Sequence, residues 1–196
     1  MKRFGKVIDH FELLAPVYDR LMGWLRRPPD RELWARLLEL PVGGRLLDAG
    51  GGTGRVSETL RPLVGQIVVC DISLGMLRRA RARGGIDGVR SDAARLPFPD
   101  AGFERAMVTD ALHHFRDQQQ VIRELARVLA PGGVLVIEEF DFRRPAVKAL
   151  AMLEKLALMG SRFLRPEDIR GLLLQAGLVA EIRKTRGSSV MIVAKK

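Results

Sequence analysis

The stretch Leu46-Leu47-Asp48-Ala49-Gly50-Gly51-Gly52-Thr53-Gly54 decides the fold, because it joins a short apolar run to closely spaced glycines. We expect a buried strand over residues 45–49, a helix over residues 56–60 and a tight turn between them. Glycine lets the backbone adopt left-handed dihedral angles and approach a ligand with no side chain in the way. The spacing D-x-G-x-G-x-G therefore predicts a loop that holds a nucleotide-containing cofactor.

A dinucleotide-binding loop would need a different spacing, G-x-G-x-x-G. Counted from Gly50 and Gly52, its last position holds Arg55 in place of glycine. This weakens the case for a pyrophosphate at the helix N-terminus. An NAD(P)-dependent oxidoreductase stays open as a third hypothesis.

Four further landmarks follow the glycine loop in order. Strands and helices are expected to alternate along this part of the chain, which is typical of a parallel sheet covered on both faces. The landmarks are Gln66-Ile67-Val68-Val69-Cys70-Asp71, the turn Ser91-Asp92-Ala93 with Leu96-Pro97-Phe98, residues 103–115 with Thr109-Asp110 and His113-His114, and residues 127–137 with Pro131-Gly132-Gly133. In such a sheet, ligands bind at the carboxyl ends of the strands, where all these acids lie.

Together the five landmarks, over roughly residues 45–140, resemble the class I S-adenosylmethionine-dependent methyltransferases. The resemblance is to methyltransferase type 11 and to the ubiquinone and menaquinone biosynthesis methyltransferases. It implies an α/β fold with a Rossmann-like seven-stranded sheet, mostly parallel with a C-terminal antiparallel hairpin, and helices on both faces. It also implies S-adenosylmethionine as cofactor and in-line methyl transfer to a small, hydrophobic or anionic molecule such as a quinone precursor or a lipid.

The resemblance also implies roles for single residues. Asp71 would accept hydrogen bonds from the ribose hydroxyls, and Asp92 would accept one from the exocyclic amine of adenine. Asp48 would either support the glycine loop or hold the methionine ammonium through water. Tyr18, in an element similar to the family's Ala-x-x-Tyr-Asp, would close over the cofactor or simply pack. The predicted cofactor site comprises Tyr18, Asp48, Gly50, Gly51, Gly52, Gly54, Asp71, Ile72, Asp92, Ala93, Thr109 and Asp110.

Catalysis by such an enzyme consists mainly of positioning, because the sulfonium is already an activated leaving group. An acceptor that carries a proton can also need a base. His113 and His114 are the candidates, and shaping the cofactor pocket is the alternative role for both. Glu138 and Glu139 would either meet a substrate or be solvated charges at a strand exit. We expect no resident metal.

The chain reads as a single methyltransferase domain over residues 1–196. We expect an N-terminal helical cap over 1–40, a cofactor-binding core over 45–140, a candidate lid over 141–165, and a closing helix and hairpin over 166–196. Helical periodicity or helix signals mark residues 5–15, 31–40, 77–83, 121–129 and 147–159, as well as the helix that starts at 166. Strands are expected at 179–183 and 190–194 around the turn 186–188.

Composition is that of a globular enzyme with a sizeable core: 47% of the 196 residues are hydrophobic. The single cysteine, Cys70, lies in an apolar strand and is expected to pack as an inert thiol. No apolar run approaches the roughly 20 residues that span a bilayer, and no signal peptide is evident. We therefore expect a cytoplasmic protein.

The net charge of +10 has two interpretations. The first is an arginine-rich solvated surface, and the second is a surface that meets an anionic membrane or a phosphate-bearing substrate. Its basic groups are Arg26 and Arg27; Arg78, Arg79, Arg81 and Arg83; and Arg183, Lys184 and Arg186. Only 6% of residues are aromatic, so a nucleic-acid partner is less favoured. The competing hypothesis is a basic S-adenosylmethionine-binding protein that acts on nucleic acid or as a partner subunit. The oligomeric state stays open.

Overall fold

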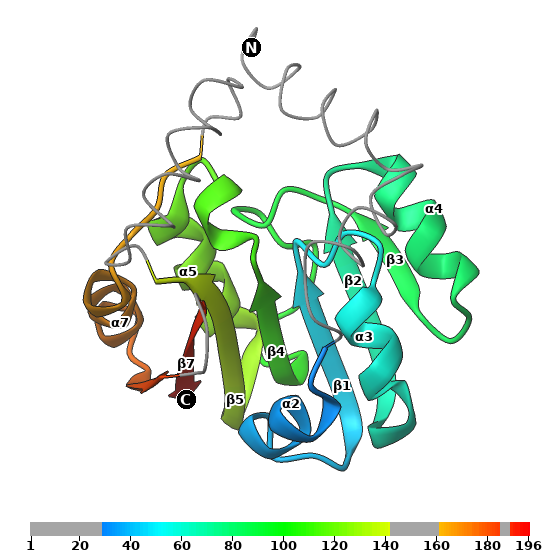
Figure 1. Ribbon diagram of the computed structural model, residues 1–196, viewed down its shortest axis with the longest axis horizontal. Coiled ribbons are helices and arrows are strands. Elements are labelled where there is room, and N and C mark those ends of the chain that lie inside the picture. Colours follow the sequence, from blue (N-terminus) through cyan, green and yellow to red (C-terminus); the bar gives the residue numbers. More distant parts are fainter. Residues whose placement is uncertain (1–28, 142–160, 185–188) are drawn as a thin grey trace, which may run out of the picture.

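A computed structural model describes residues 29–141, 161–184 and 189–196. Within them, seven strands form one sheet in the order β3-β2-β1-β4-β5-β7-β6 (Figure 1). The strands are β1 Val42–Ala49, β2 Val64–Asp71, β3 Asp87–Arg90, β4 Phe103–Thr109, β5 Leu129–Phe140, β6 Val179–Lys184 and β7 Ser189–Lys195. The helices are α2 Arg31–Leu37, α3 Arg55–Leu60, α4 Leu74–Ala82, α5 Gln118–Val128 and α7 Pro166–Gln175, with short 3-10 helices η1 Arg61–Leu63 and η2 Leu112–His114.

The strand pairing confirms the predicted topology. Strands β1 to β5 pair in parallel, and β7 pairs antiparallel with both β5 and β6. Strand β1 lies between β2 and β4, so the order of the chain reverses at this point. The carboxyl ends of β1 and β4 are therefore neighbours at the topological switch point, where an open α/β sheet binds its ligand.

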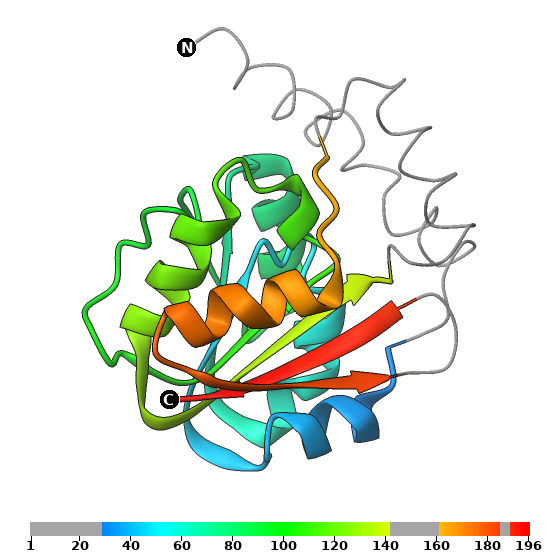
Figure 2. The same cartoon turned by 90° about the vertical axis from the view of Figure 1, so that its left-hand side faces the viewer.

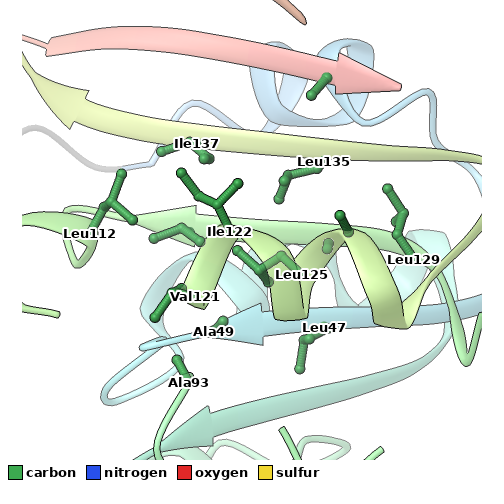
Figure 3. Packing of buried hydrophobic residues seen from close by; sticks show 14 of the residues in the cluster. Leu47, Ala49, Ala93, Leu112, Val121, Ile122, Leu125, Leu129, Leu135 and Ile137 are labelled. Atoms are coloured by element: carbon green, nitrogen blue, oxygen red, sulfur yellow. The ribbon is translucent and has the colours of Figure 1, made fainter. Parts of the chain in front are cut away.

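Both faces of the sheet are covered, as the family resemblance implied. Successive residues of the central strands alternate between two hydrophobic clusters. Leu47 packs with α5 and α7, whereas Leu46 packs with α2, α3 and α4. Figure 3 shows α5 directing Ile122 and Leu125 towards the first face. Figure 2 shows α7 and α2 on opposite sides of the sheet. Strands buried on both faces explain why the sequence contains continuous apolar runs.

The helix ends follow the expected chemistry, with small shifts of boundary. Asp30 and Ser73 cap α2 and α4 by accepting hydrogen bonds from the backbone N–H groups of Leu33 and Met76. Helix α2 ends at Leu37, three residues earlier than predicted, because Glu39 has a positive φ of 53° that interrupts helical geometry.

Cys70 is buried in β2, as expected for a cysteine that packs as a small hydrophobe, and burial raises the pKa of its thiol to about 12. In the part of the chain that the structure describes, no helix is long and apolar enough to cross a bilayer. Several predictions lie outside the described residues: the helices at 5–15 and 147–159, Tyr18, the turn at 186–188, and the basic residues Arg26, Arg27 and Arg186. Most of the predicted N-terminal cap and of the candidate lid also lies outside them.

Candidate functional site

The glycine loop between β1 and α3 lies at the carboxyl edge of the sheet (Figure 1). Its backbone adopts positive φ at Gly50, Gly52 and Gly54, at 72°, 56° and 71°. The N–H of Gly50 donates to the carbonyl of Cys70 over 2.7 Å, which ties the loop to β2. Left-handed geometry at three alternating positions explains the D-x-G-x-G-x-G spacing.

These glycines are required for different reasons. A Cβ at Gly50 would lie 2.8 Å from the Cβ of Ala111, and one at Gly51 would collide with the Asp48 carboxylate. A Cβ at Gly54 would lie 3.2 Å from Ala80 on α4. A Cβ at Gly52 would meet no described atom within 4 Å. Packing within the protein therefore opposes side chains at Gly50 and Gly51 and, less strictly, at Gly54, whereas a side chain at Gly52 would enter open space, which we call the cradle.

Asp48 is buried beneath this loop, with 1% of its surface exposed. Its Oδ2 accepts a hydrogen bond from the Ser57 hydroxyl over 2.7 Å, whereas its Oδ1 has no partner among the described residues. Burial raises the pKa of Asp48 to about 7; the charge of Asp71 adds to this rise and the Ser57 bond opposes it. A half-satisfied buried carboxylate of this kind suits a cationic partner.

Asp71, at the end of β2, connects the glycine loop to α4. Its two oxygens accept hydrogen bonds from the backbone N–H groups of Gly52 and Ser73, over 3.0 and 2.8 Å. The carboxylate of Asp71 thus binds the backbone on both sides of the gap between the glycine loop and α4. The next residue, Ile72, accepts a bond from Nε of Arg90 at its carbonyl, which fixes the backbone there.

Asp92 and Ala93 lie in the turn after β3. Asp92 is exposed, and its Oδ1 accepts a hydrogen bond from the N–H of Ala94 over 2.9 Å. Its Oδ2 has no protein partner in the described part of the chain. Ala93 is buried beneath the turn.

Thr109 and Asp110 end β4, next to the end of β1. Thr109 presents a buried hydroxyl oxygen, Oγ1, with no partner among the described residues. Asp110 has a positive φ of 48°, and its N–H donates to the carbonyl of Glu138 over 2.9 Å. A non-glycine residue in this conformation is strained, which is typical of functional sites. The strand ends thus bring Asp48, Thr109 and Asp110 to one edge of the sheet.

His113 forms a buried pair with Glu139 of β5. Its Nδ1 lies 3.0 and 2.8 Å from the two carboxylate oxygens, and its backbone N–H donates to Oε1 over 3.2 Å. The ring of Phe163 stacks on the imidazole with 4.4 Å between centroids. His113 is 2% exposed, so the pair is enclosed by protein.

His114 lies beside His113, with 4.0 Å between the ring centroids. Its Nδ1 is 3.2 Å from the hydroxyl of Ser161, in the segment that leads to α7. Burial, with a smaller contribution from His113, lowers the pKa of His114 to about 3. The imidazole is therefore neutral at physiological pH and a weak proton acceptor.

The role of Glu139 was missed by sequence reasoning, which left it as a solvated charge or a substrate contact. Alternation along β5 did not single it out: Leu135, Ile137 and Glu139 share one face, but Val134 and Val136, on the face of Glu138, are core residues as well. In the structure it is Glu139 whose carboxylate is buried and meets a donor. Among the described residues, no group of three or more His, Cys, Asp and Glu side chains is arranged to hold a metal.

Some of the arginines that were predicted to form an anion-binding surface instead make hydrogen bonds within the protein. On α4, Arg81 donates to the carbonyl of Gly88. Arg83, at its C-terminal end, donates to the carbonyl of Thr53 and pairs with Glu58. These contacts favour a structural role for two of the four arginines of this group.

Comparison with known proteins locates this site within a family. Residues 47–137 match the methyltransferase domain family. The demethylmenaquinone methyltransferase of Paenarthrobacter aurescens is 36% identical over 145 residues, which cover 71% of this chain and 57% of that protein. The ubiquinone/menaquinone biosynthesis C-methyltransferase of Pseudomonas savastanoi pv. phaseolicola is 36% identical over 150 residues, covering 69% and 58%. The chain thus spans less than two thirds of the length of these relatives.

A solved structure from Thermotoga maritima, a SAM-dependent methyltransferase described as a possible histamine N-methyltransferase, has the same fold. Its TM-score is 0.80 at 24% sequence identity, and the match covers 95% of this chain and 98% of the other. At this identity the likeness supports the architecture alone.

Proposed function

Residues 47–137 match the methyltransferase domain family, and on this premise we propose that the chain is a class I, S-adenosylmethionine-dependent enzyme that transfers a methyl group to a small molecule. The observation that carries the proposal is a pair of buried oxygens, Asp48 Oδ1 and Thr109 Oγ1, that have no hydrogen-bond partner among the described residues. They belong to β1 and β4, which are neighbours at the switch point of the sheet. Buried polar atoms are nearly always satisfied, so these two are expected to meet a ligand.

The chemistry of these groups fits the cofactor. Its methionine end carries an ammonium group, which suits the unsatisfied Asp48 carboxylate, and its ribose carries two hydroxyl donors for Asp71. The exocyclic amine of adenine suits the free oxygen of Asp92. The cradle at Gly52 allows the backbone to approach the ligand without a side chain. Tyr18 remains a proposed cover for the cofactor.

When bound, the cofactor supplies a methyl group on a positively charged sulfur, which is already activated for displacement. The chain then has to orient the donor and exclude water. Where the acceptor releases a proton, we propose His113 as its receiver in preference to His114, whose lowered pKa makes it a weak proton acceptor. The Nδ1 of His113 is held by Glu139, which leaves Nε2 as the atom that can take a proton.

We propose a hydrophobic or anionic small molecule as the methyl acceptor, with a quinone precursor as the first choice. The support is the 36% identity to a demethylmenaquinone methyltransferase. Half-buried rings of Phe140 and Phe163 beside His113 provide apolar surface close to the strand ends. Methyl transfer from labelled cofactor to a panel of hydroquinones, phospholipid head groups and amines would test this assignment.

The proposed function is tested first by calorimetric titration with S-adenosylmethionine, S-adenosylhomocysteine and NAD(P). We expect micromolar binding of the first pair and none of NAD(P). Gly52→Val should abolish this binding, because the new side chain enters the cradle.

Gly84→Val is the matched control for this variant. Gly84 also has positive φ and also has no described atom within 4 Å of an added Cβ, but it lies in the turn after α4. Gly84→Val therefore introduces the same backbone strain outside the glycine loop. Equal binding by two folded variants would contradict the proposed site, and tight NAD(P) binding would favour an oxidoreductase.

A further inference from the structure

The loop that carries Asp92, residues 91–102, joins β3 to β4 without a helix or strand of its own. Local bonds shape its first turn: Asp92 accepts from Ala94, and the Ser91 hydroxyl donates to the carbonyl of Arg95 over 2.8 Å. Bonds within the turn do not determine where the turn lies relative to the sheet. An irregular loop loses much conformational entropy when it is ordered, so its position requires contacts from elsewhere in the fold.

The N–H of Ser91 donates to the carbonyl of Asp71 over 3.1 Å, which ties the start of the loop to β2, and Ala93 and Leu96 are buried in the core. Most side-chain hydrogen bonds to the rest of the loop come from α5, chiefly from Arg127. Its guanidinium donates to the carbonyls of Leu96 and Phe98, over 3.0 and 2.8 Å, and to Oδ1 of Asp100 over 2.7 Å. Its remaining two contacts go to the oxygens of Glu124, both over 2.9 Å. Arginine carries five N–H donors in a planar fork, and all five are engaged here.

Glu124 holds the same loop from the same helix turn. Its Oε2 accepts a hydrogen bond from the N–H of Leu96 over 2.9 Å, so both backbone groups of Leu96 are bound by this pair. The bond to Arg127 also lowers the pKa of Glu124, which keeps the carboxylate ionised. Leu96 is buried and lies four residues after Asp92. The arginine–glutamate pair therefore fixes the end of the Asp92 turn nearest the core.

We propose that Arg127 and Glu124 are positioning residues that place Asp92 against the adenine of the cofactor, and so determine selectivity for its exocyclic amine. Neither residue needs to touch the cofactor, since both act through the backbone of Leu96 and the turn that precedes it. The inference rests on the proposed function, because it assumes that the adenine lies at Asp92.

The experiment compares two ligands on the full chain: S-adenosylhomocysteine, and S-inosylhomocysteine, in which a carbonyl oxygen replaces the exocyclic amine. The wild-type protein should prefer the first ligand. Arg127→Gln should weaken the binding of S-adenosylhomocysteine by about tenfold. The dissociation constant for S-inosylhomocysteine divided by that for S-adenosylhomocysteine should then be close to one. Arg127→Lys should not restore the ratio, because an ammonium has three donors where the guanidinium has five.

Arg123→Gln is the matched control. Arg123 lies one helical turn earlier on α5, is exposed, and bonds to the side chain of Gln120 at 3.5 Å. Its replacement should change neither dissociation constant. Glu124→Gln is a milder second variant in case Arg127→Gln does not fold, as judged by circular dichroism. The double variant Arg127→Gln, Asp92→Ala should discriminate between the two ligands no less than Asp92→Ala alone, because both changes act through the same contact.

The outcomes separate this inference from the proposed function. A wild-type protein that binds neither homocysteine compound refutes the cofactor and the inference with it. A wild-type protein that binds both equally refutes only the contact between Asp92 and adenine. If the wild type discriminates and a folded Arg127 or Glu124 variant keeps the same ratio, the positioning role is wrong even when overall affinity falls.

Discussion

Two buried carboxylates lie at the carboxyl ends of strands in the same sheet, and their surroundings differ. Glu139, on β5, receives the imidazole and backbone N–H of His113 and is satisfied within the protein. Asp48, on β1, has one hydrogen bond, from Ser57, and one oxygen without a described partner. Burial alone therefore does not identify a binding group. A carboxylate that the fold satisfies is structural or positioning, whereas one that the fold leaves half-satisfied is available to a ligand.

The largest effect predicted from this comparison is a change in how stability depends on pH. The pKa of Asp48 is raised from 3.8 to about 7 in the folded protein. Between these pH values the unfolded chain has released this proton while the folded chain retains it. The contribution of Asp48 to the free energy of unfolding therefore falls as pH rises from about 4 to 7 and is constant above, a total loss of about 4 kcal/mol.

Asp48→Asn cannot titrate, so it should remove this loss. Denaturant unfolding of both proteins at several pH values between 4 and 8 measures the difference. Ser57→Ala sharpens the test: the Ser57 bond holds the pKa of Asp48 down, so its removal should extend the pH-dependent loss to higher pH. If the free energy of unfolding depended on pH in the same way for wild type and Asp48→Asn, burial would not raise the pKa of Asp48.

The second prediction concerns the satisfied carboxylate. Glu139→Ala leaves His113 buried without its partner and should lower the free energy of unfolding by about 3 kcal/mol. Glu181→Ala is the control, because Glu181 pairs with Arg183 at the surface and should cost less than about 1 kcal/mol. Urea unfolding at constant pH measures both. An equal, small effect for the two variants would mean that the Glu139–His113 pair does not hold this part of the fold together.

The two carboxylates also show what the sequence could and could not reveal. The glycine spacing and the acid before it predicted the loop and Asp48, because local backbone geometry dictates which residues can occupy a left-handed turn. The pairing of Glu139 with His113 joins residues 26 positions apart. It depends on how β5 is placed beside β4, which no local pattern contains. Strand alternation places Glu138 and Glu139 on opposite faces of β5, but both faces carry core residues, so it identifies neither the buried acid nor the donor it meets.

Loop 91–102 shows the same difference between what local sequence predicts and what it does not. The family resemblance implied a turn at Asp92 after the third strand, and the structure places that turn after β3. Its anchor, Arg127, lies on a helix more than 30 residues further along the chain, and long polar side chains have many partners available in sequence alone. Contacts between distant segments become predictable only once the order of the strands and the side of the sheet each helix covers are known.

The smallest predicted effect extends the comparison to the second unsatisfied oxygen. Thr109→Val replaces a buried hydroxyl that has no described partner with a methyl group of similar shape. Removing an unsatisfied polar atom should stabilise the protein by up to about 1 kcal/mol. The same change should weaken the binding of S-adenosylhomocysteine, because the Thr109 hydroxyl is proposed to contact the cofactor. The two effects thus have opposite signs.

Thr59→Val distinguishes this outcome from a general response to the substitution. The hydroxyl of Thr59 donates to the carbonyl of Val56 over 2.7 Å, so its loss should destabilise the protein slightly and leave affinity unchanged. Thermal unfolding and calorimetric titration of both variants give the two quantities. If Thr109→Val destabilised the protein as Thr59→Val does, its hydroxyl would have to be satisfied within the fold. Thr109 would then belong with Glu139 rather than with Asp48, since an oxygen already satisfied by the protein has no unmet bond for a ligand to fill.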